Sequence, residues 1–196
     1  MYAKRNNIGM PEVSSLLING CVLIISAIWI MLPAYLPNSV AAASGGGMPV
    51  DMGRCYRDGR RILGDGKTIR GFLVGVSAGI LVGLCEIVVE SAGIVSFIPP
   101  HSIICVFTLS IGSLLGDMVK SFFKRRMGIE RGGEWILVDQ YDFLAGALIL
   151  TLLFDWQWII STITIPLLIA ILIITPLLHR IVNIIGYKIG VKKVPW

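Results

Sequence analysis

The sequence predicts an all-α membrane protein, a bundle of about five transmembrane helices with two charged cytoplasmic loops. Of its 196 residues, 55% are hydrophobic and only 15% are charged, and the mean hydropathy is +0.81. A soluble domain of this size carries about 25% charged residues. The apolar residues also gather in runs, and roughly 20 such residues cross a bilayer as a helix. We therefore expect one integral membrane domain over residues 1–196.

Five spans are expected, at residues 13–36, 71–92, 101–116, 141–154 and 157–182. The first run has 24 residues and no charge. The second carries a glycine at every fourth position from Gly71 to Gly83, and small residues at this spacing let helix backbones approach closely in lipid. Pro166 and Pro176 are expected to kink the fifth span, which neighbouring helices can accommodate.

The lysines and arginines predict the orientation of the chain. Fifteen of the seventeen lie in the loops 37–70 and 117–140 or toward the C-terminus, and the other two are Lys4 and Arg5. Basic residues near the ends of spans are retained in the cytoplasm. We therefore expect a multi-pass protein of the cell membrane, with its N-terminus outside and its C-terminus in the cytoplasm.

The segments 51–70 and 117–142 combine cations, carboxylates and glycines on the same side of the membrane. Arginine and lysine neutralise phosphate oxygens, glycines let backbone N–H groups approach them, and carboxylates bind Mg²⁺ that bridges to substrate phosphates. Asp117, Asp139 and Asp142 stand out because each lies at the boundary of a span. The composition indicates a phosphate and metal site; the alternative is a pair of anchoring loops whose charges pair with each other and with lipid headgroups.

Three other classes of site are disfavoured. No nucleic-acid-binding module accompanies the net charge of +5. The string from Gly64 to Thr68 resembles the end of a P-loop, but Arg61 stands where the first glycine is required. A zinc site is disfavoured because there is no C-x-x-C pair and the only histidines are His101 and His179.

Two motifs resemble a known enzyme family. Ser121-Phe-Phe-Lys-Arg125 and Asp139-Gln-Tyr-Asp142 are similar to the S-x-x-K-R and D-R-x-D signature of CDP-diacylglycerol synthases, with Gln140 in place of arginine. The upstream string from Asp58 to Gly71 resembles the compact archaeal branch, the CDP-archaeol synthases. This resemblance covers nearly the whole chain.

The resemblance implies a CTP-dependent nucleotidyltransferase with Mg²⁺ as its cofactor. Its partners would be CTP, an isoprenoid glycerol phosphate lipid and the bilayer. CTP and 2,3-bis-O-(geranylgeranyl)-sn-glycerol 1-phosphate would give the unsaturated CDP-lipid and diphosphate. The lipid phosphate is already ionised near neutral pH, so alignment and charge neutralisation would carry the catalysis.

The site residues implied by the resemblance fall into three groups. Asp117, Asp139 and Asp142 would hold the metal and act in catalysis together with Lys124. The cations expected to contact phosphates are Arg60, Arg61, Lys67, Arg70, Lys120, Lys124 and Arg125. Asp58, Asp65 and Thr68 would orient these cations or read the cytosine.

Two alternatives remain open at this point. A CDP-diacylglycerol synthase acting on ester phosphatidate would share the same motifs. A small membrane transporter would place its ionisable residues near the middle of the bilayer, where only Glu86 and Glu90 could serve. The lipid chain type and the oligomeric state are not readable from the sequence.

Overall fold

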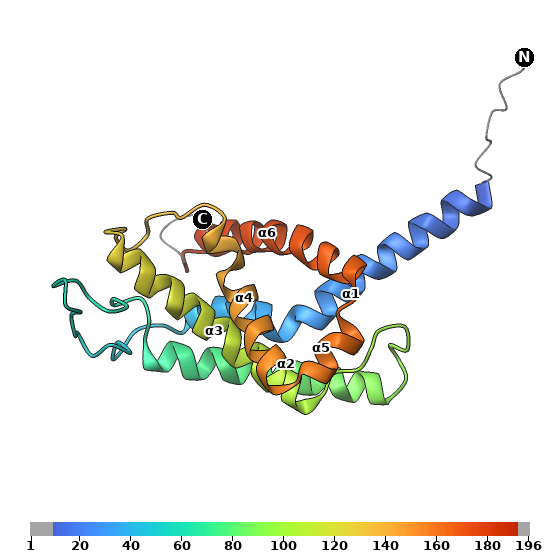
Figure 1. The fold of residues 1–196 in the computed structure, drawn as a ribbon, viewed down its shortest axis with the longest axis horizontal. Coiled ribbons are helices and arrows are strands. Elements are labelled where there is room, and N and C mark those ends of the chain that lie inside the picture. Colours follow the sequence, from blue (N-terminus) through green and yellow to red (C-terminus); the bar gives the residue numbers. More distant parts are fainter. Residues whose placement is uncertain (1–9, 192–196) are drawn as a thin grey trace, which may run out of the picture.

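The structure, a computed structural model, describes residues 10–191 (Figure 1). Over this range the chain is helical and contains no strand, apart from isolated bridges that join Pro49 to Thr68 and Cys55 to Arg61. The helices are α1 (Met10–Ala43), α2 (Ile69–Ser91), α3 (Ile103–Arg126), α4 (Val138–Phe154), α5 (Trp156–Thr162) and α6 (Ile165–Lys188). The predicted all-α fold is confirmed.

Four helices, α1, α2, α3 and α6, are long and apolar enough to cross a membrane. The pair α4 and α5 passes the same test together, although it bends by 116° between Phe154 and Trp156. Residues 10–191 therefore contain four candidate spans, or five if the bent pair crosses as one, and the chain is a multi-pass membrane protein.

Two of the predicted segments differ from the structure. Residues 157–182 do not form one helix, because α5 ends at Thr162 and α6 begins at Ile165. The segment 117–140 is not a loop throughout, because α3 continues to Arg126 and α4 begins at Val138. Asp117, Lys120 and Lys124 consequently lie on a helix, one turn apart, where they can share a face. Lys4, Arg5, Lys192 and Lys193, used to predict the orientation, lie outside the described residues.

The glycines of α2 allow it to lie directly on α1. A side chain at Gly75 would come within 2.6 Å of the carbonyl oxygen of Pro37, and one at Gly79 within 2.7 Å of that of Pro33. Both prolines lie inside α1, where each removes a backbone hydrogen bond. The predicted close approach of α2 to a neighbour is therefore confirmed, and at Gly75 and Gly79 the neighbouring backbone is that of α1.

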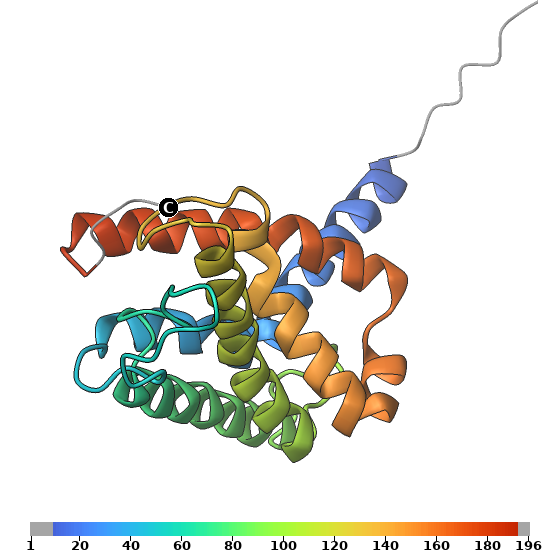
Figure 2. The ribbon, with the colours of Figure 1, turned by 60° about the vertical axis from the view of Figure 1, so that its left-hand side comes forward.

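Helices α3 and α4 form the most extensive contact in the molecule and cross side by side in both views (Figures 1 and 2). The crossing is also lined with glycine: a side chain at Gly112 would meet the main chain of Gly146 at 2.6 Å. Such close crossings are typical of small residues in lipid. This contact matters for function because it aligns the start of α4 with the C-terminal half of α3.

A buried polar cluster ties α1, α2 and α3 together at the end of α2. The Glu90 carboxylate accepts hydrogen bonds from Trp29 Nε1 at 2.8 Å and from the His101 main-chain N–H at 2.8 Å. His101 Nδ1 lies 2.7 Å from the same carboxylate, and His101 Nε2 lies 4.0 Å from Glu86. The two glutamates that a transporter could have used are thus packed into the fold.

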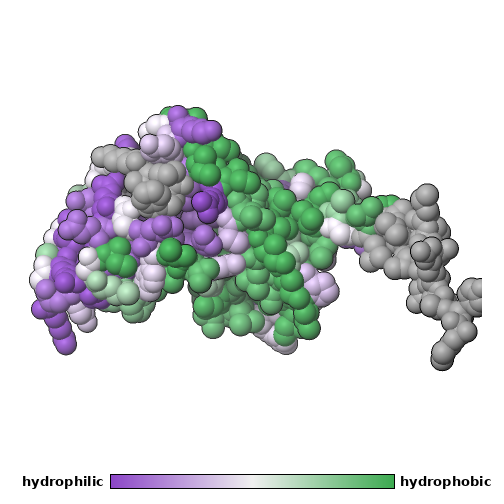
Figure 3. All heavy atoms as spheres, turned by 90° about the horizontal axis from the view of Figure 1, so that it is seen from above, coloured by the Kyte–Doolittle hydropathy of each residue, from purple (hydrophilic) through white to green (hydrophobic). Residues whose placement is uncertain are grey.

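Polar and apolar surfaces are segregated (Figure 3). Hydrophilic residues gather at the end formed by the loops 44–68 and 127–137, and hydrophobic residues cover the helices beyond it. The part of α1 nearest the N-terminus extends away from the bundle at the opposite end (Figures 1 and 2). The charged groups of both loops therefore share one interface.

Candidate active site

Three carboxylates converge on the ammonium group of Lys120. Its Nζ lies 2.8 Å from Asp142 Oδ2, 3.0 Å from Asp117 Oδ1 and 3.2 Å from Asp139 Oδ1. Asp117 and Lys120 come from α3, whereas the other two carboxylates come from the first turn and a half of α4. The glycine crossing described above makes this convergence possible, because it brings the two helices close at this level.

Two further lysines complete the cluster. Lys124, buried on α3, donates to Gly133 O at 2.7 Å and lies 2.6 Å from Asp139 Oδ1. Lys67, from the loop that precedes α2, forms an ion pair with Asp117. Three cations thus face three carboxylates, in a partly buried setting where electrostatic interactions are stronger than in water.

The cluster lines a cavity of about 260 Å³. The wall also includes Asn38 and Ala42 of α1, Gly132 and Gly133 of the loop before α4, Phe143 of α4, and His179 and Asn183 of α6. The cavity therefore lies where four helices and two loops meet. Positive charge, small residues and carboxylates around a space of this size suit a phosphate-bearing ligand.

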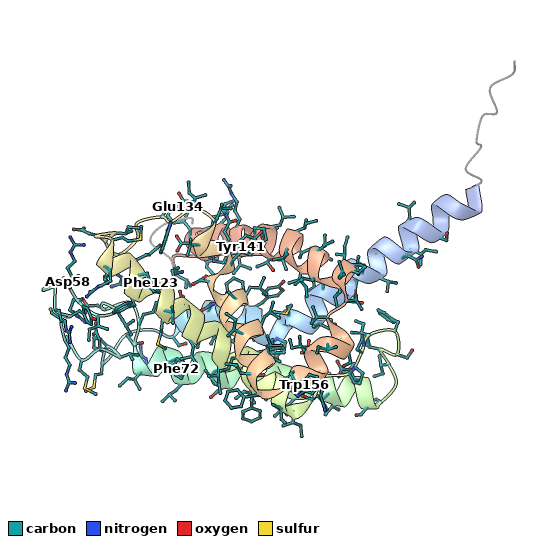
Figure 4. All side chains as sticks on the ribbon, viewed as in Figure 1. Asp58, Phe72, Phe123, Glu134, Tyr141 and Trp156 are labelled. Carbon is teal, nitrogen blue, oxygen red and sulfur yellow. The ribbon has the colours of Figure 1, made fainter. Side chains whose placement is uncertain are left out.

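The first turns of α4 are fixed on both sides of the cavity. Tyr141, labelled in Figure 4, donates its hydroxyl to Leu172 O of α6 at 2.8 Å. Asp139 Oδ2 accepts the main-chain N–H of Trp135 at 2.7 Å. Leu137, just before the helix, has φ 69°, a left-handed conformation that a bulky residue adopts only where its surroundings enforce it. The backbone strain thus lies two residues from Asp139, which supports a functional role for this turn.

The loop 44–68 is organised around Asp51, a residue that the sequence motifs did not single out. Its buried carboxylate lies 2.6 Å from Arg61 Nη2 and accepts the main-chain N–H groups of Leu63 at 3.0 Å and Gly64 at 2.9 Å. Burial by itself raises the pKa of Asp51, but these hydrogen bonds, with one from Gly53, outweigh it and hold the pKa well below its usual range. Asp51 therefore keeps its charge and anchors the loop.

Most of the cations predicted in 58–70 hold this loop in place and do not line the cavity. Arg61 binds Asp51 and also Asp65, at 2.6 Å. Arg60 donates to the carbonyl oxygen of Arg126 at 3.0 Å, and Arg126 lies 2.8 Å from Asp58. These contacts clamp the loop onto the end of α3.

The remaining predicted residues also divide into those that hold the loop in place and those that line the cavity. Arg70 donates to Ser44 O at 2.9 Å and to Gly45 O, and Thr68 caps the N-terminus of α2 by accepting the N–H of Gly71 at 3.1 Å. Arg125 lies beside Gly64, outside the cavity wall. Of the thirteen predicted site residues, the cavity brings together Lys67, Asp117, Lys120, Lys124, Asp139 and Asp142.

Sequence reasoning missed the residues that α1 and α6 contribute to the cavity. Asn38, His179 and Asn183 are separated from the charged motifs by tens of residues, and the latter two lie in an apolar helix. A polar residue buried in a span is a signal of function, and Asn183 is 3% exposed. That rule would have identified Asn183, whereas nothing in the sequence marks Asn38.

No group of three acidic, histidine or cysteine side chains within residues 10–191 is arranged to hold a metal ion. Lys120 lies between the three aspartates. On the cavity wall, Asn38 Oδ1 is buried and has no hydrogen-bond partner among the described residues, whereas Asp139 Oδ1 and Asp142 Oδ2 are paired with lysine ammonium groups. Carboxylate and amide oxygens are the ligands that a hard cation such as Mg²⁺ requires, so the cavity has the chemistry to hold one if the lysines turn away.

Comparison with known proteins gives a consistent result. The family model described as CarS-like, CDP-archaeol synthase, matches residues 21–196. A CDP-archaeol synthase of Methanospirillum hungatei is 70% identical over 166 residues, and one of Methanoculleus marisnigri is 56% identical over 166 residues. Each alignment covers 85% of this chain and the whole of the relative.

One solved structure, described as an intramembrane enzyme for archaeal membrane lipid biosynthesis, has the same fold. It superposes with a TM-score of 0.67 and 39% sequence identity, over 82% of this chain and 94% of its own. Together with the match to the family model over most of the length, this similarity shows that the chain belongs to the CDP-archaeol synthase family.

Proposed function

We propose that this protein transfers the cytidylyl group of CTP to the phosphate of an unsaturated archaeal ether lipid, 2,3-bis-O-(geranylgeranyl)-sn-glycerol 1-phosphate. A lipid phosphate oxygen attacks the α-phosphorus of CTP and forms the new P–O bond. The bond from the α-phosphorus to the oxygen that bridges to the β-phosphorus breaks, and diphosphate leaves. The products are CDP-archaeol in its unsaturated form and diphosphate.

The observation that carries this proposal is the cavity lined by three lysines and three aspartates at the polar end of an apolar bundle. A nucleotide is soluble and highly charged, whereas the lipid is confined to the membrane. A site at the interface is where both can meet. The family membership gives the reaction its identity. The reaction needs no strong general base, because a phosphate monoester has its second pKa near 6 and is ionised at neutral pH.

In this reaction the lysines neutralise charge. Lys67, Lys120 and Lys124 would contact the triphosphate and the charge that develops on the leaving diphosphate. Of the other predicted cations, Arg61 and Arg70 act indirectly, by holding the loop that positions Lys67. Arg60 does the same at the junction of this loop with α3, where it donates to the carbonyl oxygens of Arg125 and Arg126, and the Arg125 side chain lies beside Gly64 of the loop.

Mg²⁺ fits the cavity as a cofactor. Asp117 and Asp142 would hold it, with Asp139 positioned beside them by Lys124. When bound, the ion supplies charge neutralisation to the phosphate oxygens. Mg²⁺ typically uses one or two carboxylates together with substrate phosphates, so a complete protein cage is not required. Lys120, which lies between the same carboxylates, would turn toward the phosphates as the nucleotide enters.

The proposed orientation places the loops 44–68 and 127–137 in the cytoplasm, where CTP is available. Cys55 tests it, because this thiol is exposed on the first loop, whereas the other described cysteines, Cys21, Cys85 and Cys105, lie in apolar helices. A membrane-impermeant thiol reagent should leave Cys55 unlabelled in intact cells and label it in inverted vesicles. Labelling in intact cells would show that Cys55 lies outside the cell and that the orientation is the opposite of the proposed one.

The decisive experiment measures turnover by the purified protein with CTP, Mg²⁺ and the geranylgeranyl ether phosphate. Diphosphate and CDP-lipid should form in equal amounts with CTP and should not form with ATP. Turnover with ester phosphatidate and none with the ether lipid would assign the chain to CDP-diacylglycerol synthesis. No turnover with either lipid in folded protein would refute the proposal and favour a transporter.

A further inference from the structure

A second cavity, of about 360 Å³, adjoins the first. It lies between the segment that leads into α4 and the C-terminal half of α6. Its wall includes Ile136, Asp139, His179, Arg180, Asn183 and Ile184. Asp139, His179 and Asn183 also line the first cavity, so a ligand in the second cavity would lie directly beside one in the first.

The wall of this second cavity is amphiphilic. Ile136 is 69% exposed and Ile184 is 37% exposed, and α6 is one of the candidate membrane spans. Exposed isoleucines beside a spanning helix face lipid, where their exposure costs nothing. The cavity therefore has an apolar side, formed by these isoleucines, and a charged side that it shares with the first cavity.

Arg180 is the cation of this cavity. Its guanidinium is exposed and makes no hydrogen bond or ion pair with the residues that the structure describes. Arg60, Arg61 and Arg70, in contrast, bind carbonyl or carboxylate oxygens. None of the other residues in 10–191 thus occupies the donors of Arg180, and arginine can bind phosphate through two parallel hydrogen bonds.

The carboxylates near Arg180 do not oppose an anion here. Asp139 is neutralised by Lys124 at 2.6 Å and Lys120 at 3.2 Å. Glu134 lines the cavity as well, but its side chain is exposed on the loop before α4, at the edge of the fold in Figure 4. Solvent screens an exposed charge of this kind.

We propose that the second cavity binds the lipid substrate: Arg180 contacts its phosphate, and the isoprenoid chains leave along Ile136 and Ile184 into the membrane. This inference rests on the proposed function. A single arginine suits a phosphate monoester, whereas the three lysines of the first cavity suit a triphosphate. When CTP occupies the first cavity, the lipid phosphate in the second cavity approaches the α-phosphorus of CTP. The two ligands then meet beside Asp139, His179 and Asn183, which line both cavities.

The test separates the two substrates kinetically. Turnover of Arg180→Gln, Arg180→Lys and wild-type protein is measured in mixed micelles while either the lipid mole fraction or the CTP concentration is varied. Arg180→Gln should raise the KM for the lipid phosphate about tenfold or more, as expected for loss of a charge-assisted hydrogen bond, and leave the KM for CTP unchanged. Arg180→Lys should recover part of the loss. Lys188→Gln, on the same helix but outside both cavities, should match wild type.

A second variant tests the apolar side. Ile184→Trp would fill the part of the cavity that faces the chains and should also raise the KM for lipid but not for CTP. Thermal melting in detergent verifies that each variant is folded. Inhibition by inorganic diphosphate and by glycerol 1-phosphate is measured for each protein, because a free phosphate could use the same arginine.

The outcomes are distinct. An inactive wild-type protein would refute the proposed function itself. An active wild type with an unchanged lipid KM in both Arg180→Gln and Ile184→Trp would overturn the lipid site alone. An increase in the KM for CTP, or weaker inhibition by diphosphate with an unchanged lipid KM, would assign the cavity to the nucleotide or to the leaving group and would also overturn it.

Discussion

Gly116 of α3 lies directly against the main-chain carbonyl of Asp142 on α4, with no space between them for a side chain. The contact brings Asp142 next to the residue that follows the glycine, Asp117, so that both carboxylates reach Lys120. The alignment of the two carboxylates therefore depends on the backbone contact between α3 and α4. A substitution of this glycine acts on the site without altering any of its functional groups.

Gly116→Ala is expected to reduce turnover strongly and to destabilise the protein by about 1–3 kcal/mol, because the added methyl group must push α3 and α4 apart. Turnover and thermal melting in detergent measure the two effects. Gly20→Ala is the matched control, since nothing lies within 4 Å of a side chain at that position. Wild-type melting and activity in Gly116→Ala would show that the crossing is not needed to align the carboxylates.

Asp51→Asn is expected to loosen the loop 44–68. The low pKa of Asp51 means that the folded loop favours the carboxylate, so its stabilisation is complete above the ordinary carboxyl pKa and is lost as the pH falls through the lowered folded value. Hydrogen exchange of the amides of Leu63 and Gly64, corrected for intrinsic rates, should accelerate in wild-type protein only at acid pH. In Asp51→Asn it should already be fast at neutral pH.

Asp65→Asn is the control for this loop, because Asp65 binds the same Arg61 from an exposed position, its side chain being 66% exposed. Surface ion pairs contribute about 0–1 kcal/mol, so exchange should stay close to wild type. Equal acceleration in both variants would show that Arg61, and not the buried carboxylate of Asp51, holds the loop.

Thr68→Ala distinguishes a structural role from a binding role. Because Thr68 caps α2, its loss should cost about 1 kcal/mol of stability, and Thr68→Ser should restore it. The KM for CTP should not change in either variant. An increase in that KM with unchanged melting would return Thr68 to the nucleotide site, as the sequence predicted.

The helices and the carboxylate–lysine face were predictable because they follow from periodicity. Hydrophobic runs mark the spans, and Asp117, Lys120 and Lys124 share a face once α3 is known to continue past residue 116. The loop 44–68 has no such period. Arg61 and Lys67 look equivalent in the sequence, yet one binds Asp51 and the other reaches Asp117. Their difference depends on turns such as the one at Gly64, with φ 89°.

The path of α6 was unpredictable for another reason. His179 and Asn183 reach the cavity only because α5 and α6 turn the chain back over α4, whereas the expected structure of residues 157–182 was a single span with proline kinks. The bend at Asp155 sets that path. Tertiary packing of this kind leaves no local pattern to read.

Asp139→Asn is expected to reduce turnover about 100-fold or more, as is typical when a charged group that positions transition-state contacts is neutralised. The asparagine keeps the shape and can still accept from Trp135, but it leaves the buried Lys124 without its counter-ion. Lys124 would then be free to turn away from the phosphates. Steady-state kinetics with CTP and lipid should show the loss mainly in kcat, with the protein still monodisperse and folded.

Glu130→Gln is the matched control, since this carboxylate lies on the same loop region, is exposed and lines neither cavity. It should turn over at the wild-type rate. If Asp139→Asn also did so, Asp139 would be an anchoring residue of the loop. The three carboxylates would then reduce to a pair, Asp117 and Asp142, which is still sufficient for one Mg²⁺ bridged to substrate phosphates.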